Sequence, residues 1–228
     1  MRTKQRDSSI LTLDYWTTPA SNYPRQRVGD AEIATHRCAR GIYECYGVGG
    51  FALFEAIKPL SITNLKIRRR VWMVDDPPHW LAMMEHARQY HGHVVCAGLG
   101  LGLIVHALAQ NRAVNKITVV EINPDVIRMV KPLVPECEVV QAHFWDWSGK
   151  PDGVLYDLFT GKGRDLLDSA IAVYMGLKAK FPKSVIRIHG FNNDALVATD
   201  SWLAATGDSN LRQRWRGVVN DRDHGSAQ

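Results

Sequence analysis

The stretch Val94-Val-Cys-Ala-Gly-Leu-Gly-Leu-Gly102 joins a short apolar run to a turn with glycine at every second position. Such an apolar run is typical of a buried strand, and residues 101–111, rich in Leu, Ala, Ile and Val, favour a helix. Glycines let the backbone bend tightly and approach a ligand closely, and the start of a helix presents free N–H groups. The stretch therefore predicts a strand, a ligand-binding turn and a helix.

Strand and helix patterns alternate on the carboxyl side of this turn. We expect strands at 93–97, 116–121, 138–141, 153–157 and 184–189, and helices over 101–111, 123–134, 165–180 and 196–205. Strands that alternate with helices imply a parallel sheet with right-handed crossovers. The predicted fold class is α/β, a Rossmann-like parallel-core sheet with helices on both faces.

The residues before this sheet have a different pattern. Residues 1–40 are polar and interrupted by Pro and Gly, so we expect an irregular segment there, whereas short strands bounded by Gly and Pro fit 41–74. We expect Arg68-Arg-Arg70 to form a solvated hairpin tip. The predicted organisation is an N-terminal extension and small β-rich unit over 1–75, followed by the Rossmann-like domain over 76–228.

Composition limits the function classes only weakly. The chain has 228 residues, 46% of them hydrophobic and 22% charged, which fits one α/β domain with an appendage. The net charge of +5 is compatible with a nucleic-acid partner but does not require one. A cluster near the C-terminus, Arg212, Arg214, Trp215 and Arg216, resembles a basic-aromatic patch and is weak support for such a partner.

Cysteine spacing and apolar runs suggest no metal, disulfide or membrane. Cys38, Cys45, Cys96 and Cys137 form no CxxC pair, so we expect neither a disulfide framework nor a metal site. The charged N-terminus is not followed by the apolar run of a signal peptide, and no segment is long enough to span a bilayer. We therefore expect a cytoplasmic protein without a membrane partner.

The identity of the ligand depends on the glycine register and on Glu121. Neither Gly98 nor Gly100 starts a GxGxxG pattern, which disfavours a dinucleotide ligand such as NAD or FAD. No Gly-Lys-Ser/Thr is present, so the turn is not a P-loop. Glu121 ends the second predicted strand, 19 residues after Gly102. A carboxylate there can accept hydrogen bonds from the vicinal hydroxyls of a ribose, which NAD and S-adenosylmethionine share. The GxGxG turn favours S-adenosylmethionine.

Together with Ile117-Thr-Val-Val-Glu-Ile-Asn-Pro-Asp125, the glycine stretch resembles class I S-adenosylmethionine-dependent methyltransferases, and within them the spermidine-synthase-like branch. The resemblance covers about residues 71–190. It implies that the turn binds the methionine moiety and ribose, that Glu121 binds the ribose hydroxyls, and that Ile122 packs against adenine. The turn residues implied are Ala97, Gly98, Leu99, Gly100 and Gly102.

The adenine end of the implied site departs from the family pattern. The family often has Gly-Asp after the third strand, where this chain has Ala142-His143. His143 could stack on adenine, and Phe144 could offer backbone hydrogen bonds, while a surface-loop histidine is the alternative. The resemblance also implies that Asp157, at the end of the fourth strand, faces the methyl donor and acceptor.

Two strand ends and one preceding segment supply candidates for chemistry. Asp157 and His189 are candidates for acceptor orientation or proton removal. In the family, the segment before the cofactor domain closes over the site, which makes Asp75, Asp76 and His79 candidates for substrate or lid contacts. Asp76 also fits a simpler role, the N-cap of a helix from about 79 to 90.

The predicted function is S-adenosylmethionine-dependent methyl transfer to an unidentified acceptor. Asp157-Leu-Phe-Thr-Gly-Lys-Gly-Arg164 replaces the acidic run with which aminopropyltransferases bind polyamines, and its two cations disfavour a cationic acceptor. Aminopropyl transfer stays an alternative, as does a non-catalytic protein that binds S-adenosylmethionine or a nucleotide. An exposed strand edge in the β-rich unit would allow a homodimer.

Overall fold

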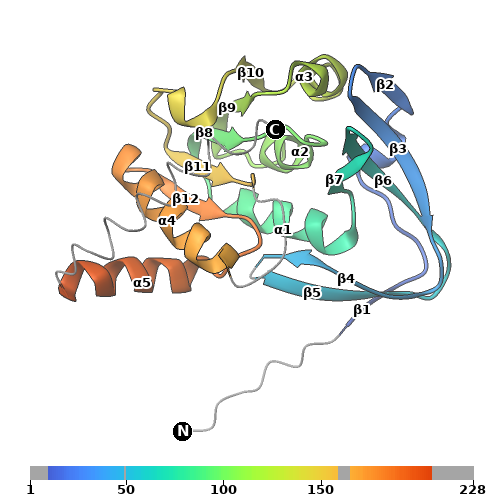
Figure 1. Ribbon diagram of the computed structural model, residues 1–228, viewed down its shortest axis with the longest axis horizontal. Coiled ribbons are helices and arrows are strands. Elements are labelled where there is room, and N and C mark those ends of the chain that lie inside the picture. Colours follow the sequence, from blue (N-terminus) through green and yellow to red (C-terminus); the bar gives the residue numbers. More distant parts are fainter. Residues whose placement is uncertain (1–9, 49, 159–164, 207–228) are drawn as a thin grey trace, which may run out of the picture.

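The computed structural model describes residues 10–48, 50–158 and 165–206, which form a five-stranded parallel sheet preceded by a β-rich unit (Figure 1). In the parallel sheet, the central strand β8 (Gly92–Ala97) lies between β9 (Val114–Glu121) and β11 (Gly153–Tyr156). The outer strands are β10 (Glu138–Gln141), beside β9, and β12 (Val185–Ile188), beside β11.

The strand order β10-β9-β8-β11-β12 is that of a Rossmann-like sheet, in which the chain winds outward from the centre in two directions. Ligands of such sheets bind at the carboxyl ends of the strands, where the direction of winding changes. Here that point lies between β8 and β11. The predicted fold class is confirmed, and each predicted strand of the sheet is present to within two residues at either end.

Helices cover both faces of the sheet because alternate residues of β8 point to opposite sides. Val94 and Cys96 belong to a core with α1 (Pro77–Arg88), α2 (Leu103–Ala109) and α3 (Pro124–Val130). Val95 and Ala97 belong to a second core, with α4 (Asp165–Lys180) and α5 (Asn193–Thr206). Figure 1 shows α4 and α5 side by side in orange and red. Short 3₁₀ turns complete the chain at Pro19–Asn22, Lys131–Leu133 and Phe144–Asp146.

The β-rich unit consists of two sheets with the orders β1-β5-β4 and β2-β3-β6-β7. Its strands are β1 (Leu11–Leu13), β2 (Gln26–Val28), β3 (Ala31–Cys38), β4 (Gly41–Gly47), β5 (Gly50–Ala56), β6 (Leu60–Ile67) and β7 (Arg70–Val74). Buried residues of both sheets, among them Phe54 and Ile62, share a small core. The predicted β-rich unit is confirmed.

The expectation of an irregular segment over 1–40 is wrong for much of its described part. β3 runs antiparallel to β6 along its whole length, and Ala31 and Ile33 are buried. Polar residues such as Glu32 and His36 separate the apolar ones, so the strand is recognisable only once its partner is known. The predicted hairpin tip between β6 and β7 is confirmed, with Arg68 and Arg69 at positive φ.

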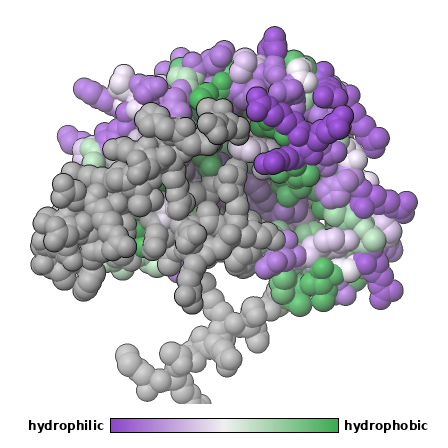
Figure 2. Space-filling model, in the orientation of Figure 1, coloured by the Kyte–Doolittle hydropathy of each residue, from purple (hydrophilic) through white to green (hydrophobic). Residues whose placement is uncertain are grey.

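The β-rich unit and the α/β sheet share one hydrophobic core. Ala31, Ile33 and Leu65 lie in the same cluster of buried residues as Met83 and Leu103. Figure 2 shows a largely hydrophilic surface on the upper right of the molecule, on the side where Figure 1 labels α3 and β2. Within the described residues, no helix combines the length and apolarity needed to cross a membrane.

Candidate functional site

The turn after β8 has a backbone that only glycine adopts easily. Gly98, Gly100 and Gly102 have φ of 88°, 51° and 71°. A Cβ added at Gly98 would lie 2.7 Å from Leu158 Cδ2, and one at Gly102 would lie 2.5 Å from Val134 Cγ1. The alternating glycines therefore serve both backbone conformation and close packing.

Glu121 ties this turn to the end of β9. Its Oε2 accepts a hydrogen bond from Leu99 N and its Oε1 accepts one from Asn123 N, both at 2.8 Å. The residue is only 9% exposed. A carboxylate offers about four acceptor sites, so two remain for hydroxyl groups of a ligand. Glu121 is thus placed to hold the turn and a ligand together.

A cavity of about 860 Å³ opens above the carboxyl ends of β8, β9 and β11. That volume is in the range of small-molecule sites, about 300–1,000 Å³. Most of the predicted cofactor residues line it. These are Ala97, Gly98, Leu99, Gly100, Glu121, Ile122 and Asp157.

The other three predicted cofactor residues are not among the described residues that line the cavity. Gly102 is the N-cap of α2 and packs against Val134. His143 precedes a 3₁₀ turn after β10, and Phe144 is buried in the second core beside Tyr156. The adenine contacts expected for His143 and Phe144, and the cofactor contact expected for Gly102, therefore stay predictions.

The two aspartates predicted for a lid instead lie in the interior. Asp75 is fully buried and accepts a hydrogen bond from Thr18 Oγ1, and burial raises the pKa of its carboxyl to about 7. Asp76 caps α1 by accepting a hydrogen bond from His79 N at 2.9 Å, and burial raises its pKa to about 6. The simpler role of Asp76, as a helix cap, is confirmed.

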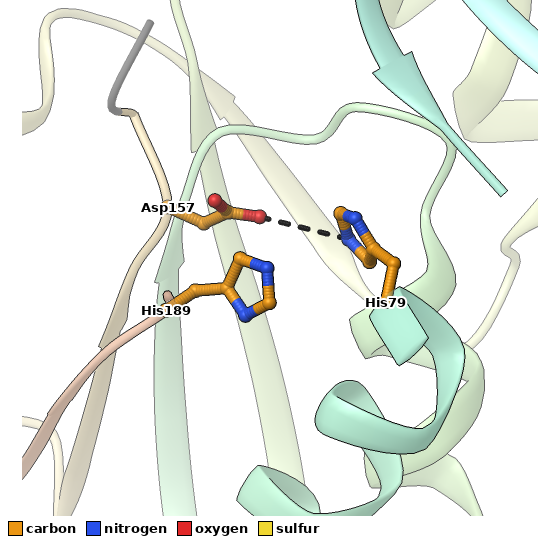
Figure 3. A group of neighbouring side chains, drawn as sticks. All are labelled: His79, Asp157 and His189. Atoms are coloured by element: carbon orange, nitrogen blue, oxygen red, sulfur yellow. Dashed lines mark ion pairs between the residues drawn. The ribbon is translucent and has the colours of Figure 1, made fainter. Parts of the chain in front are cut away.

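The third residue of that segment, His79, meets the two predicted catalytic residues (Figure 3). His79 Nε2 lies 4.0 Å from Asp157 Oδ2, and the ring centroids of His79 and His189 are 4.7 Å apart. Asp157 and His189 follow the adjacent strands β11 and β12, and His79 lies in the first turn of α1.

Burial controls the ionisation of this group of three. It lowers the pKa of His79 and of His189 to about 3, with the neighbouring histidines acting in the same direction. Burial also raises the pKa of Asp157, against the effect of His79. Both imidazoles are therefore neutral at pH 7, and each keeps a free lone pair on one ring nitrogen.

Sequence reasoning expected the segment from Trp72 to Trp80 to close over the site, but it missed the part of the cavity wall that the preceding hairpin contributes. Trp72 and Met73 of β7 line the cavity, as do Arg68 and Arg70 at the preceding hairpin. It also missed His86, two helical turns after His79, whose ring meets His189 edge-on at 5.7 Å. A tryptophan beside the basic run Arg68-Arg-Arg70 in a short predicted strand is the sequence signal that could have indicated the wall.

Two sets of residues lie outside the described part of the chain. One is the segment after Leu158, which includes Lys162 and Arg164 and carried the argument against a polyamine. The other is the C-terminal basic-aromatic cluster at Arg212, Arg214, Trp215 and Arg216.

No protein-family model and no curated protein matches the chain. Similar solved structures include the 23S rRNA methyltransferase ErmE, with 24% identity over 35% of this chain and 35% of that chain and a TM-score of 0.31. The ribosomal protein L11 methylase of Lactobacillus delbrueckii subsp. bulgaricus has 14% identity over 55% of this chain and 65% of that one, with a TM-score of 0.39.

A third similar structure is a SAM-dependent methyltransferase from Thiobacillus denitrificans in complex with S-adenosyl-L-homocysteine. It has 14% identity over 49% of this chain and 48% of that chain, with a TM-score of 0.36. This chain therefore spans less than two thirds of the length of all three proteins.

Proposed function

We propose that the chain is an S-adenosylmethionine-dependent methyltransferase whose acceptor is unidentified. The observation that carries the proposal is the cavity in which the glycine turn and Glu121 face the same space. Gly98 and Gly100 line the cavity beside Leu158 and Met73, and their lack of side chains suits close approach of a ligand from the open side. The remaining lone pairs of Glu121 suit ribose hydroxyls.

The residues that would hold S-adenosylmethionine are those the cavity brings together. Gly98 and Gly100 would lie along the methionine and ribose, Glu121 would accept from the ribose, and Ile122, 62% exposed, would cover one face of adenine. When bound, S-adenosylmethionine would supply an activated methyl group: an acceptor lone pair would bond to the methyl carbon as the carbon–sulfur bond breaks, with S-adenosylhomocysteine as the leaving group.

The chain's own part in the reaction is then mainly positioning and exclusion of water. Asp157 lines the cavity at the end of β11, where it can orient an acceptor or take its proton. The raised pKa of Asp157 makes it a stronger base than an exposed aspartate. His189 is not among the described residues that line the cavity, so its proposed role is to support Asp157 from the adjacent strand end.

Calorimetry with S-adenosylmethionine and S-adenosylhomocysteine tests the binding claim. We expect one ligand per chain, with about tenfold or greater weakening in Glu121→Gln because the amide replaces one charged acceptor by a donor. The matched control is Glu136→Gln, an exposed glutamate outside the cavity lining, which should bind as the natural chain does. If neither ligand binds, the proposal is wrong.

Product analysis separates methyl transfer from the alternatives. The chain is incubated with S-adenosylmethionine or its decarboxylated form and pools of nucleic acids, proteins, small molecules and polyamines, and products are identified by mass spectrometry. Methylated product from S-adenosylmethionine is the expected result. Aminopropylated polyamine would replace the proposal by aminopropyl transfer, and ligand binding without product in every pool would favour a binding protein without turnover.

A further inference from the structure

His79, Asp157 and His189 converge from three separate parts of the fold. β11 and β12 are adjacent parallel strands, so the residues that follow them leave the sheet side by side, and α1 brings His79 against both. One ligating atom from each residue lies within 4.8 Å of those of the other two. Figure 3 shows the two imidazole rings and the carboxylate around one small space.

Three of the four imidazole nitrogens of this group are buried and have no hydrogen-bond partner within the described part of the chain. His189 is 6% exposed, and neither its Nδ1 nor its Nε2 has a hydrogen-bond partner among the residues that the structure describes. His79 is 8% exposed, and its Nε2 also lacks one. Leaving a polar group buried and unsatisfied costs about 1–3 kcal/mol, and native proteins rarely do so without an ion, a water or a catalytic reason. Three such nitrogens in one place indicate that a ligand belongs between them.

Direct hydrogen bonds among the three residues do not explain the arrangement. The 4.0 Å between His79 Nε2 and Asp157 Oδ2 exceeds the usual hydrogen-bond range, about 2.7–3.2 Å. The two rings are tilted by 38° at a centroid distance of 4.7 Å, which leaves them in contact but not bonded. A relay of the triad type requires a nitrogen-to-oxygen hydrogen bond that is not present here.

We propose that His79, Asp157 and His189 bind one divalent transition-metal ion of the zinc class. Two imidazoles and one carboxylate are a common ligand set for Zn²⁺ and for Fe²⁺, and they leave at least one coordination position for water or substrate. Neutral imidazole is the form that binds metals, and the carboxylate supplies attraction for the cation. The ligating atoms now lie up to 4.8 Å apart. Metal-to-ligand distances of about 2.0–2.2 Å would require the three side chains to move closer together on binding. This proposal differs from the expectation, drawn from cysteine spacing, that the chain has no metal site.

The position of Asp157 joins this metal site to the cavity. Asp157 lines the cavity that also holds Gly98 and Glu121, so an ion on its carboxylate lies at the side of the space proposed for the methyl donor. A bound ion lowers the pKa of a coordinated hydroxyl or thiol. In that role, which rests on the proposed function, it would hold the acceptor atom as an anion after its proton is released to water, and Asp157 would then act as a ligand of the ion in place of a base. Metal binding itself does not depend on methyl transfer.

Titration of the chelator-treated full chain with metal alone tests the proposal. We expect calorimetry with Zn²⁺ to show one high-affinity step per chain, and Co²⁺ to give visible d–d absorption bands of a low-symmetry site. His189→Gln and Asp157→Asn should both lose the step and the bands. His91→Gln, at an exposed histidine before β8, is the matched control and should keep them.

Three results would overturn the proposal: no stoichiometric step, equal isotherms for the natural chain and His189→Gln, or loss of the step in His91→Gln. Asp157→Asn is the more conservative of the two substitutions, because the two side chains have nearly the same shape. Circular dichroism checks that each variant is folded. Loss of Zn²⁺ binding in a folded variant supports the proposal. S-adenosylhomocysteine titrations of the same samples separate the two proposals. Binding of that ligand without binding of Zn²⁺ removes the metal site and leaves the proposed function intact.

Discussion

Met73 lies directly over Gly100. Its sulfur accepts a hydrogen bond from Leu101 N at 3.1 Å, and a Cβ added to Gly100 would lie 2.5 Å from that sulfur. Met73 belongs to β7 of the β-rich unit, whereas Gly100 belongs to the turn after β8. The β-rich unit therefore forms one wall of the proposed cofactor site and limits what the turn can accommodate.

Gly100 and Gly102, two glycines of the same turn, should differ in their tolerance of alanine because they face different side chains. At Gly102 the obstacle is Val134, a stiff β-branched side chain that is fully buried, so Gly102→Ala should destabilise the fold by about 2–4 kcal/mol through strain and overpacking. At Gly100 the obstacle is a flexible thioether, and the cost should be smaller. Urea unfolding of both variants measures the difference.

A double-mutant cycle isolates the cause of that difference. Combining Gly102→Ala with Val134→Ala removes the clash, so the pair should be coupled by about 1 kcal/mol or more. Additive effects within about 0.5 kcal/mol would show that backbone strain, and not Val134, sets the cost.

Asp75 should make stability fall as pH rises. Its pKa of about 7 in the fold is far above the ordinary value of 3.8, so the folded chain binds the proton more tightly than the unfolded chain. This contribution is fully present below about pH 4 and is lost as pH rises through 7, up to about 4 kcal/mol. Asp75→Asn keeps an acceptor for Thr18 but does not titrate.

The measurement is the free energy of unfolding of both chains from pH 4 to pH 8. The stability of the natural chain relative to Asp75→Asn should decline across that window. Parallel curves would show that Asp75 is ionised in the fold at all these values.

The hydroxyl of Tyr90 should contribute measurably to the free energy of unfolding, because its hydrogen bond is buried. It donates to Val154 O at 2.8 Å inside the core, so Tyr90→Phe leaves a buried carbonyl short of a partner and should cost about 1–3 kcal/mol. Tyr43→Phe is the control, since that hydroxyl donates to Ala39 O at the surface and should cost about 0.5 kcal/mol or less. Equal losses of stability in thermal unfolding would contradict this explanation.

Asn193 should hold the end of β12 in place. Its side chain accepts from Ile188 N at 2.7 Å and donates to Ile188 O and Phe191 O, so it braces the turn that carries His189. Asn193→Ala should lower stability by about 2 kcal/mol and weaken Zn²⁺ binding, while Asn115→Ala, at an exposed site in β9, should do neither. Unchanged Zn²⁺ affinity in a folded Asn193→Ala would show that the turn holds itself.

The sequence predicts what depends on local pattern. The glycine turn and Glu121 are recognisable because each combines a residue type with a strand end, and α4 has the predicted bounds Asp165–Lys180. The cavity wall at Met73 and the position of His79 depend on contacts between segments far apart in the chain. No periodicity within β7 or α1 encodes such contacts.

The positions of three other predicted site residues, which are not among the described residues of the cavity lining, have the same origin. Gly102 shares the spacing of its neighbours, yet it packs against Val134, a contact that only the folded chain defines. Asp75 and Asp76 are adjacent acids that look suited to a lid, but α1 and the β-rich unit bury both. A charged residue type predicts an exposed side chain only when the folded interior offers it no hydrogen-bond partner, and Thr18 is such a partner for Asp75.

The four cysteines place a chemical probe in two of the three hydrophobic cores. Cys38 and Cys45 lie in the core of the β-rich unit, and Cys96 and Cys137 lie in the core shared with the sheet. Burial raises the pKa of all four thiols, and only an exposed thiolate reacts quickly with an alkylating reagent. Labelling rates under native conditions therefore record how often each core opens. Faster labelling of Cys38 and Cys45 would show that residues 1–75 unfold independently of the sheet. Equal rates for all four thiols would show that both cores open in one cooperative unfolding event.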